Sequence, residues 1–332
     1  MKKFNIAVLG DGGWGTTLSI ILSQKGFKVT LWGAFADYSN YLNKKRINTK
    51  FLSGIKIPPS IEIVSDLEKA LCGKGLIIFA IPSQHLRGVL NKIKKINYNR
   101  KALYVSVTKG IEIGTLQRMS EVIHNELGNI KLAVLSGPTI AHEVALGVPT
   151  TAVVAAHDEK IRKIAQSVFM TDKFRIYTNP DVTGVELGGS LKNVIAIACG
   201  ACDGLGFGTN TKAAILSRGL AEIARLGAAM GANISTFSGL SGLGDLVTTC
   251  VSPFSRNRSF GEAIGRGKTL KQAKAHTQMV AEGVPTAKSA YDLSRKYKVD
   301  MPITKEVYAV LYKNKSPLKA VRDLMARQKK EE

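Results

Sequence analysis

Three glycines near the start of the chain have the spacing that lets a peptide backbone approach a phosphate. Gly10, Gly12 and Gly15 lie in the octet GDGGWGTT, which directly follows the apolar run NIAVL. In a G-x-G-x-x-G loop the first glycine permits a tight turn, the second admits a pyrophosphate and the third lets the following helix pack closely. The N-terminus of that helix favours an anion. This context favours dinucleotide binding over a purely structural turn.

A lysine in the second half of the chain has the surroundings of a proton donor. Lys192 lies in ELGGSLKNV, and its helical neighbours at i−4, i−3 and i+4 are Gly188, Gly189 and Ala196. The ammonium is therefore not covered by its own helix, and a lysine in a closed site exchanges a proton readily. The alternative is a surface lysine whose two glycines only weaken the helix.

Other polar stretches could contact an anionic ligand. Lys109 follows an apolar run in SVTKGIE, at the strand end where ligands bind in parallel sheets. Arg256 and Asn257, in SPFSRNRSFG, provide a guanidinium and an amide suited to phosphate oxygens. LSGPTIAHE (135–143) also follows an apolar run, and GLSGLGDLVTTC (239–250) is too rich in glycine for an ordinary core helix. Each stretch by itself also fits a solvated loop.

The elements that must position these residues change type along the chain. In the first half, continuous apolar runs alternate with helical patterns, which indicates a parallel sheet covered on both faces. The expected strands are 4–9, 28–32, 76–81, 102–107, 131–136, 151–156 and 174–178. After about residue 180 only helices are expected, over 184–204, 211–231, 284–297, 303–313 and 317–332. We therefore predict an α/β chain with a Rossmann-type parallel-sheet domain over 1–183 and an all-helical substrate domain over 184–332.

Composition excludes several other classes of protein. The net charge of +22 is spread along the chain without a zinc-finger spacing or an RNP-like aromatic motif, so a basic surface is favoured over a nucleic-acid partner. The four cysteines are too few for a disulfide scaffold. Cys199 and Cys202 form a C-x-x-C inside an apolar helical pattern, without the second pair that zinc requires, so we expect them to be buried and no metal to be bound. No apolar run is expected to span a membrane, and no signal peptide is recognised, so a cytoplasmic protein without integral membrane association is expected.

Several motifs taken together resemble those of a known family. GDGGWGTTL, VTKG, SGPT, LGGSLKNVIAI, GLSGLGDLVTTC, SRN and VAEGVPT occur in that order between about residues 5 and 325. The ordered set resembles bacterial NAD(P)-dependent glycerol-3-phosphate dehydrogenases. The resemblance implies an oxidoreductase that uses NAD or NADP to reduce dihydroxyacetone phosphate to sn-glycerol 3-phosphate for phospholipid synthesis. It also suggests a homodimer.

The resemblance implies a role for particular residues of this chain. Lys192 matches the proton donor and acceptor at the C2 oxygen of the substrate. The implied substrate contacts are Lys109, Gly137, Thr139, Lys192, Asp245, Ser255, Arg256 and Asn257. The implied cofactor contacts are Gly10, Gly12, Gly13, Trp14, Gly15, Lys109, Ala141, Arg256, Val280 and Glu282.

Two departures from the family pattern concern the cofactor. The family has His or Arg after the WG dipeptide, where this chain has Ala34, and the first acid beyond it is Asp37. An acid at this place marks NAD and an arginine marks NADP, so the preference stays open. His142 replaces a lysine of the family pattern. Two alternatives also remain at this stage, a two-domain dehydrogenase for another small acid and a nucleotide-sensing or nucleic-acid-binding protein on the same scaffold.

Overall fold

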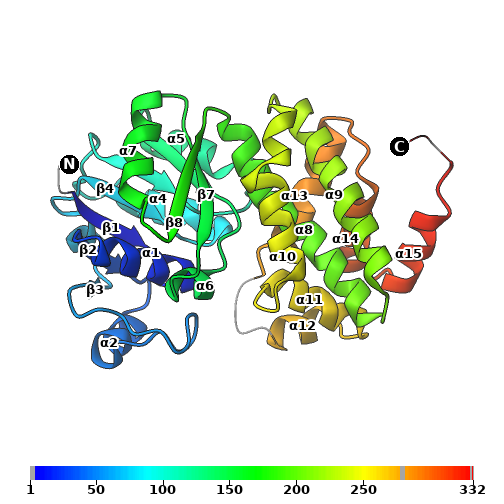
Figure 1. Cartoon of the computed structure of the whole chain (residues 1–332), viewed down its shortest axis with the longest axis horizontal. Coiled ribbons are helices and arrows are strands. Elements are labelled where there is room, and N and C mark those ends of the chain that lie inside the picture. The colour runs from blue at the N-terminus through cyan, green and yellow to red at the C-terminus, as the bar shows by residue number, and fades with distance from the viewer. Residues whose placement is uncertain (1–3, 277–280, 330, 332) are drawn as a thin grey trace. The chain divides into compact units, whose positions relative to one another are not determined.

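The chain forms two compact units (Figure 1). The computed structural model describes residues 4–276, 281–329 and 331. The sheet unit comprises Met1–Lys109 and Gln117–Glu186, and the helical unit comprises Gly110–Leu116 and Leu187–Glu332. The short segment Gly110–Leu116 thus belongs to the helical unit although it lies within the first half of the sequence.

The sheet unit is built on one eight-stranded sheet with the order β3-β2-β1-β4-β5-β6-β7-β8. The strands are β1 (Asn5–Leu9), β2 (Lys28–Trp32), β3 (Glu62–Val64), β4 (Leu76–Phe79), β5 (Leu103–Ser106), β6 (Lys131–Ser136), β7 (Thr150–Ala155) and β8 (Phe174–Asn179). Neighbouring strands in this described sheet are parallel except β6 and β7, which pair antiparallel. The expected parallel sheet is therefore confirmed apart from that pair.

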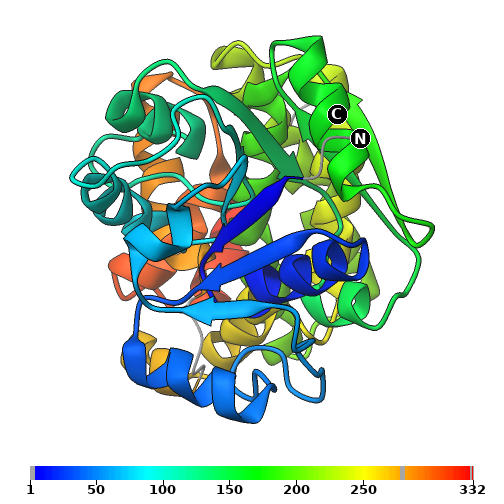
Figure 2. The ribbon, with the colours of Figure 1, turned by 90° about the vertical axis from the view of Figure 1, so that its left-hand side faces the viewer.

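Helices cover the sheet on both faces, as the continuous apolar strands require. Along β1, Ile6 and Val8 belong to one core, while Ala7 and Leu9 belong to another, because alternate residues of a strand point to opposite faces. The first core takes in α1 (Gly13–Gln24), α2 (Ala36–Lys45), α6 (Ala141–Ala145) and α7 (Glu159–Phe169), and the second α3 (Leu67–Leu71), α4 (Ser83–Ile93) and α5 (Met119–Leu127). Figure 2 shows α1 and the helices of the second core on either side of the strands.

The helical unit has a core of its own around α8. Its helices are α8 (Val182–Gly204), α9 (Thr209–Ala229), α10 (Asp245–Val251), α11 (Arg256–Gly265), α12 (Leu270–His276), α13 (Gly283–Lys296), α14 (Pro302–Tyr312) and α15 (Pro317–Met325), with short turns η1 (Ile234–Ser238) and η2 (Leu240–Gly244). Segment 110–116 is tied to this unit, because the hydroxyls of Ser190 and Ser289 donate to the carbonyl oxygens of Gly110 and Ile111, at 3.2 and 3.1 Å.

The helix α8 corrects the expectation that no apolar segment could span a membrane. By its length and composition alone, α8 could cross a membrane. Of its most apolar 18-residue window, however, 89% is buried inside the protein. We therefore assign it as a core helix. Cys199 and Cys202, on this helix, are 0% and 3% exposed, which confirms their expected burial.

Glycines allow α8 and α11 to pack backbone against backbone. A Cβ at Gly200 or Gly204 of α8 would lie 1.9 Å from the Arg258 carbonyl oxygen or 2.3 Å from that of Glu262. A Cβ at Gly261 or Gly265 of α11 would lie 2.1 or 2.2 Å from a carbonyl oxygen of α8. These distances are far below a van der Waals contact, so this crossing accepts glycine on both helices. We call these four residues the glycine crossing.

Several elements differ from the sequence-based expectation. The three-residue edge strand β3 was not expected, and α15 ends at Met325 rather than at residue 332. GLSGLGDLVTTC folds as the π-helical turn η2 followed by α10, and SPFSRNRSFG forms the start of α11 rather than a loop. Ser255 caps α11, because its side chain accepts a hydrogen bond from the Arg258 backbone N–H at 3.3 Å.

Candidate active site

The glycine loop joins β1 to α1 and leaves space in front of one glycine. Gly10 has φ +121°, and a Cβ there would lie 2.4 Å from the Ala80 carbonyl oxygen. A Cβ at Gly15 would lie 1.9 Å from the Gly10 carbonyl oxygen. A Cβ at Gly12, by contrast, would meet no described atom within 4 Å. Gly10 and Gly15 are therefore required by local packing, whereas the space at Gly12 is open.

That open space lies at the N-terminus of a twelve-residue helix. Gly12 is the N-cap of α1, and within the described part of the chain no side chain caps this end. Unsatisfied N–H groups and the helix dipole favour a negatively charged group at such a position. The residues present thus fit the pyrophosphate of a dinucleotide.

Three further predicted cofactor contacts lie in or beside this loop, namely Gly13, Trp14 and Ala141. A Cβ at Gly13 would be 3.7 Å from the Cβ of Ala141, at the start of α6, and 2.6 Å from the Phe51 carbonyl oxygen. The hydroxyl of Thr17 donates to the Ala141 carbonyl oxygen at 3.0 Å. Trp14 packs edge-on against Phe174, with ring centroids 6.2 Å apart. The structure therefore brings Gly13 and Ala141 together, while Trp14 contributes to packing.

Lys109 lies with two predicted substrate contacts in the sheet unit. Its ammonium donates to the Gly137 carbonyl oxygen at 3.0 Å and to the Thr139 hydroxyl oxygen at 3.3 Å. Lys109 follows β5, and Gly137 follows the neighbouring strand β6. Because the carboxyl ends of parallel strands lie at one edge of a sheet, the three residues meet there.

In the helical unit, Lys192 is buried in a polar cluster. Its side chain is 7% exposed, and its ammonium forms an ion pair with Asp245, at the start of α10. It also donates to the Thr249 hydroxyl oxygen at 2.6 Å, and Thr249 in turn donates to the Asp245 carbonyl oxygen at 2.7 Å. The surface-lysine alternative is therefore wrong. A buried ammonium beside a carboxylate and a hydroxyl is held in one position, from which it can give a proton to an oxygen.

Gly188, one turn before Lys192 on α8, allows η2 to approach α8 closely. A Cβ at Gly188, one turn before Lys192, would lie 2.5 Å from the Ser241 carbonyl oxygen in η2. The absence of that Cβ lets the turn that leads into Asp245 approach α8. The glycines that leave Lys192 uncovered by its own helix thus also admit its carboxylate partner.

The predicted phosphate-side residues are joined to α8 through amides. The Asn257 side chain donates to the Asn193 amide oxygen at 2.9 Å and accepts from the Gly283 backbone N–H at 2.8 Å. Arg256, the first residue of α11, is exposed and interacts electrostatically with Glu282. Ser255 is 5% exposed as the N-cap of α11. Val280 lies outside the described residues.

Two contacts were missed by sequence reasoning. Thr249 lies four residues after Asp245 in DLVTTC, so a helical assignment for that stretch would have placed both on one face. Asn193 directly follows Lys192, but its partner Asn257 is 64 residues away. No local pattern predicts such a contact.

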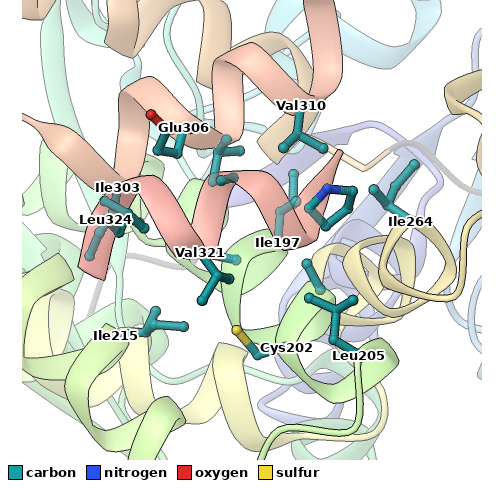
Figure 3. A pocket seen from close by; sticks show the side chains of 15 residues that line it. Ile197, Cys202, Leu205, Ile215, Ile264, Ile303, Glu306, Val310, Val321 and Leu324 are labelled. Carbon is teal, nitrogen blue, oxygen red and sulfur yellow. The ribbon is translucent and has the colours of Figure 1, made fainter. Parts of the chain in front are cut away.

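A pocket elsewhere in the helical unit is apolar and contains none of the predicted residues. Its volume is about 60 Å³, and it is lined from α8, α9, α11, α14 and α15 by side chains such as Ile197, Cys202 and Leu324 (Figure 3). The carboxylate among its lining residues, Glu306, forms an ion pair with Lys315. Such a lining offers a phosphorylated substrate no free charge, so this pocket is not the candidate site.

Comparison with family models covers most of the chain. Residues 5–162 match the model described as the NAD-dependent glycerol-3-phosphate dehydrogenase N-terminus. Residues 181–322 match the model described as the C-terminus of the same enzymes.

Full-length relatives and solved structures agree with the family models. The chain is 48% identical over 327 residues to glycerol-3-phosphate dehydrogenase [NAD(P)+] of Thermoanaerobacter sp., with 98% of each chain covered. The crystal structure of glycerol-3-phosphate dehydrogenase from Coxiella burnetii superposes with a TM-score of 0.95 at 37% identity, covering 98% of this chain and 99% of that one. The corresponding enzyme structure from Saccharomyces cerevisiae gives a TM-score of 0.82 at 30% identity, with 98% and 100% covered.

Proposed function

The chain belongs to the family of NAD-dependent glycerol-3-phosphate dehydrogenases, and on that premise we propose how its residues carry out the reaction. The family's enzymes interconvert dihydroxyacetone phosphate and sn-glycerol 3-phosphate, an alcohol used for phospholipid synthesis. This chain is accordingly an NAD(P)-dependent oxidoreductase that acts on a CH–OH group. When bound, the nicotinamide supplies the hydride for C2 of the ketone.

Lys192 donates the proton that completes the reduction. As C2 receives hydride, the carbonyl oxygen gains negative charge and takes a proton from the ammonium of Lys192. In the reverse direction the neutral amine accepts that proton from the alcohol. The observation that carries this proposal is the burial of Lys192 against Asp245 and Thr249. The carboxylate keeps the ammonium in place and compensates its charge.

The remaining predicted residues hold the two ligands. Lys109, Gly137 and Thr139 contact the substrate from the sheet unit, and the positive charge of Lys109 also contacts the cofactor. Ser255, Arg256 and Asn257 bind the substrate phosphate, because a guanidinium and an amide match its oxygens. Asp245 contacts the substrate in addition to its ion pair with Lys192.

The cofactor residues follow the open end of α1. The backbone of Gly10, Gly12, Gly13, Trp14 and Gly15 cradles the pyrophosphate. Ala141 from α6 and Arg256, Val280 and Glu282 from the second half of the chain complete the contacts. The open space at Gly12 supports this assignment.

The proposal also covers the domain boundary, the location of the protein in the cell and its oligomeric state. The sheet domain extends over 1–183, apart from the segment Gly110–Leu116, and the helical domain over 184–332, so the main boundary falls near the start of α8. The protein acts in the cytoplasm without a nucleic-acid partner and forms a homodimer. Light scattering on the eluting peak of a gel-filtration column measures the assembly, and a monomer at micromolar concentration would contradict the dimer.

Replacement of Lys192 tests the proposed mechanism. Oxidation of NADH or NADPH with dihydroxyacetone phosphate is followed by absorbance. Lys192→Ala is expected to reduce kcat by about a hundredfold to ten-thousandfold, the range typical of a lost proton transfer. Cofactor binding, measured by fluorescence, persists. Lys212→Ala is the matched control, because Lys212 is another paired lysine of the helical unit, 2.6 Å from Asp203. Turnover of Lys192→Ala near the normal rate would refute the assigned role.

A further inference from the structure

Asp11, inside the glycine loop, is half-buried, and one oxygen of its carboxyl group is buried without a hydrogen-bond partner among the described residues. Its Oδ2 atom is inaccessible to solvent and has no hydrogen-bond partner among the described residues. The Ser39 hydroxyl is buried in the same way within the described chain. Both atoms lie around Gly33, because a Cβ at Gly33 would be 2.4 Å from Asp11 Oδ2 and 2.8 Å from Ser39 Oγ. The carboxyl therefore lies directly beside the residue that follows β2.

The backbone of Asp11 is fixed in this position. The Gly10 N–H donates to the carbonyl oxygen of Trp32, the last residue of β2, at 2.9 Å. The Asp11 carbonyl oxygen accepts from the side-chain amide of Asn48 at 2.8 Å. Asn48 in turn accepts from the Tyr38 hydroxyl at 2.7 Å. The position of the carboxyl is thus set by β2 and by two side chains from outside the loop.

A buried carboxyl oxygen without a hydrogen bond is costly, and it calls for an explanation. Burial raises the pKa of Asp11 above its usual value, and a hydrogen bond from its own backbone N–H and the charge of Lys50 partly oppose this effect. An unsatisfied buried polar group costs roughly 1–3 kcal/mol. In a dinucleotide-binding sheet, the end of the second strand is where an acid accepts a hydrogen bond from the ribose 2′-hydroxyl of NAD. The Asp11 carboxyl lies at that end.

The residues after β2 do not themselves provide such an acid. Gly33 and Ala34 have no polar side chain, and Phe35 is 74% exposed. Asp37 is the first acid beyond β2, and it is exposed in the first turn of α2. Gly33 leaves the space in which the Asp11 carboxyl lies, because any larger residue there would collide with it.

We propose that Asp11, which reaches the end of β2 from the glycine loop, accepts a hydrogen bond from an adenosine ribose hydroxyl and makes this chain prefer NAD to NADP. The inference rests on the proposed function, because it concerns the cofactor of that same site. A carboxylate at this place accepts from a ribose hydroxyl and repels the 2′-phosphate that NADP carries there instead. The specificity acid has thus moved from the strand to the loop.

One nearby cation could act in the opposite sense. The Lys50 ammonium lies 5.2 Å from the centroid of the Phe51 ring and 5.9 Å from that of Tyr38, and it interacts electrostatically with Asp11. A free ammonium there would attract a 2′-phosphate. Because this ammonium lies over two aromatic rings and forms no ion pair with Asp11 in the described structure, we expect Lys50 to affect the choice of cofactor less than Asp11 does.

Direct binding measurements on the full chain test the proposal. NADH and NADPH are titrated separately, with nicotinamide fluorescence as the signal, into the unaltered protein, Asp11→Asn and Asp11→Ala. The unaltered protein is expected to bind NADH at least about tenfold more tightly than NADPH, which corresponds to about 1.4 kcal/mol. Asp11→Asn keeps the size of the side chain and removes its charge, so the ratio of the two affinities is expected to fall about tenfold. Thermal unfolding of both variants reports whether they are folded.

Two matched variants separate the alternatives. Asp37→Asn removes the other acid near the end of β2 and is expected to leave the ratio unchanged. Lys50→Ala is expected to change it by less than about threefold. An unchanged ratio in folded Asp11→Asn, a loss of preference in Asp37→Asn instead, or tighter NADPH binding by the unaltered protein would each overturn the inference. If the unaltered protein binds neither nucleotide, the proposed function itself fails.

Discussion

Two arginines at the start of α11, Arg256 and Arg258, have different surroundings. Arg256 is exposed, with Glu282 nearby, whereas Arg258 forms an ion pair with Asp203 at 2.7 Å. We expect Arg256→Ala to raise KM for dihydroxyacetone phosphate by ten- to a hundredfold, because a charge-assisted contact to phosphate is worth about 1.5–3 kcal/mol. Steady-state kinetics at saturating cofactor measure this change.

The neighbouring arginine provides the control for that prediction. Arg258→Ala breaks the ion pair with Asp203 on α8, so we expect it to lower the melting temperature and to leave KM within about threefold. If KM rises in Arg258→Ala and stays constant in Arg256→Ala, the phosphate contact belongs to Arg258 and the prediction is wrong.

Sequence reasoning pointed to the residues that we propose as reactive, and it missed some of the residues that contact them in the structure. The glycines around Lys192 predicted an uncovered lysine because helical spacing is a local property. Asp11 was passed over because the x positions of a glycine motif carry no expectation. Its significance depends on Gly33 and Ser39, which the fold brings to it from beyond β2. Such contacts between distant residues have no signature in a single sequence.

At the scale of elements, the glycine crossing of α8 and α11 sets a limit on side-chain size. We expect Gly261→Ala to lower the free energy of unfolding by roughly 1–3 kcal/mol, because its Cβ would meet backbone that cannot move aside. Gly88→Ala, in α4, is the control, since its Cβ would meet no described atom within 4 Å. That substitution is expected to stabilise by about 0.5–1 kcal/mol through helix propensity. Urea unfolding measures both, and equal effects would contradict the close approach.

The two helices α4 and α5 are linked by a carboxylate whose charge depends on pH. Hydrogen bonds from Lys94 and Arg87 hold the pKa of Glu126 below its usual 4.5. A lowered pKa in the folded state stabilises at pH values above 4.5, and this stabilisation is lost as the pH falls through the folded value. Glu126→Gln is therefore expected to cost roughly 0.5–1 kcal/mol at pH 7 and progressively less below about pH 4.5.

Urea unfolding at a series of pH values checks this dependence. Glu159→Gln serves as the comparison, because the Glu159–Lys163 pair is exposed on both sides. We expect Glu159→Gln to leave the free energy of unfolding unchanged at every pH of the series. A cost at Glu126 that stays constant down to pH 3 would exclude an ionised carboxylate as its source.

The elements were predicted well where the sequence pattern is strong. Fully apolar runs such as LIIF predicted buried strands, and the spacing of apolar residues predicted the long helices. The edge strand β3 is three residues long and has too short a run to be recognised. The antiparallel direction of β7 depends on how the chain returns to the sheet, which a run of TAVVA does not encode.

For the whole molecule, the net charge of +22 acts on anionic ligands before they bind. A positively charged protein attracts a phosphorylated substrate, and salt screens this attraction. We expect kcat/KM for dihydroxyacetone phosphate to fall several-fold when sodium chloride is raised from about 20 to about 300 mM, with kcat little changed. Steady-state kinetics across this range provide the measurement, and a flat kcat/KM would show that the excess charge does not steer the substrate.

The division of the whole chain was predicted more coarsely than its elements. The only signal for the second domain was the point at which the alternation of strands and helices gives way to helices. The sequence did not predict that Gly110–Leu116 belongs with the helical unit, because the bonds that tie it there come from Ser190 and Ser289, far along the chain. Lys109 directly precedes this segment, so it is the last residue of the sheet unit before the chain changes units.

The glycine crossing also has an evolutionary consequence. Where two side chains collide in a core, a change on one helix can be rescued by a smaller residue on the other. No such rescue exists for Gly200, Gly204, Gly261 and Gly265, because each would collide with backbone and no residue is smaller than glycine. The four positions can therefore drift neither singly nor in compensating pairs. A library randomised over α8 and α11 and selected for folding would return glycine at all four, while the flanking positions diversify.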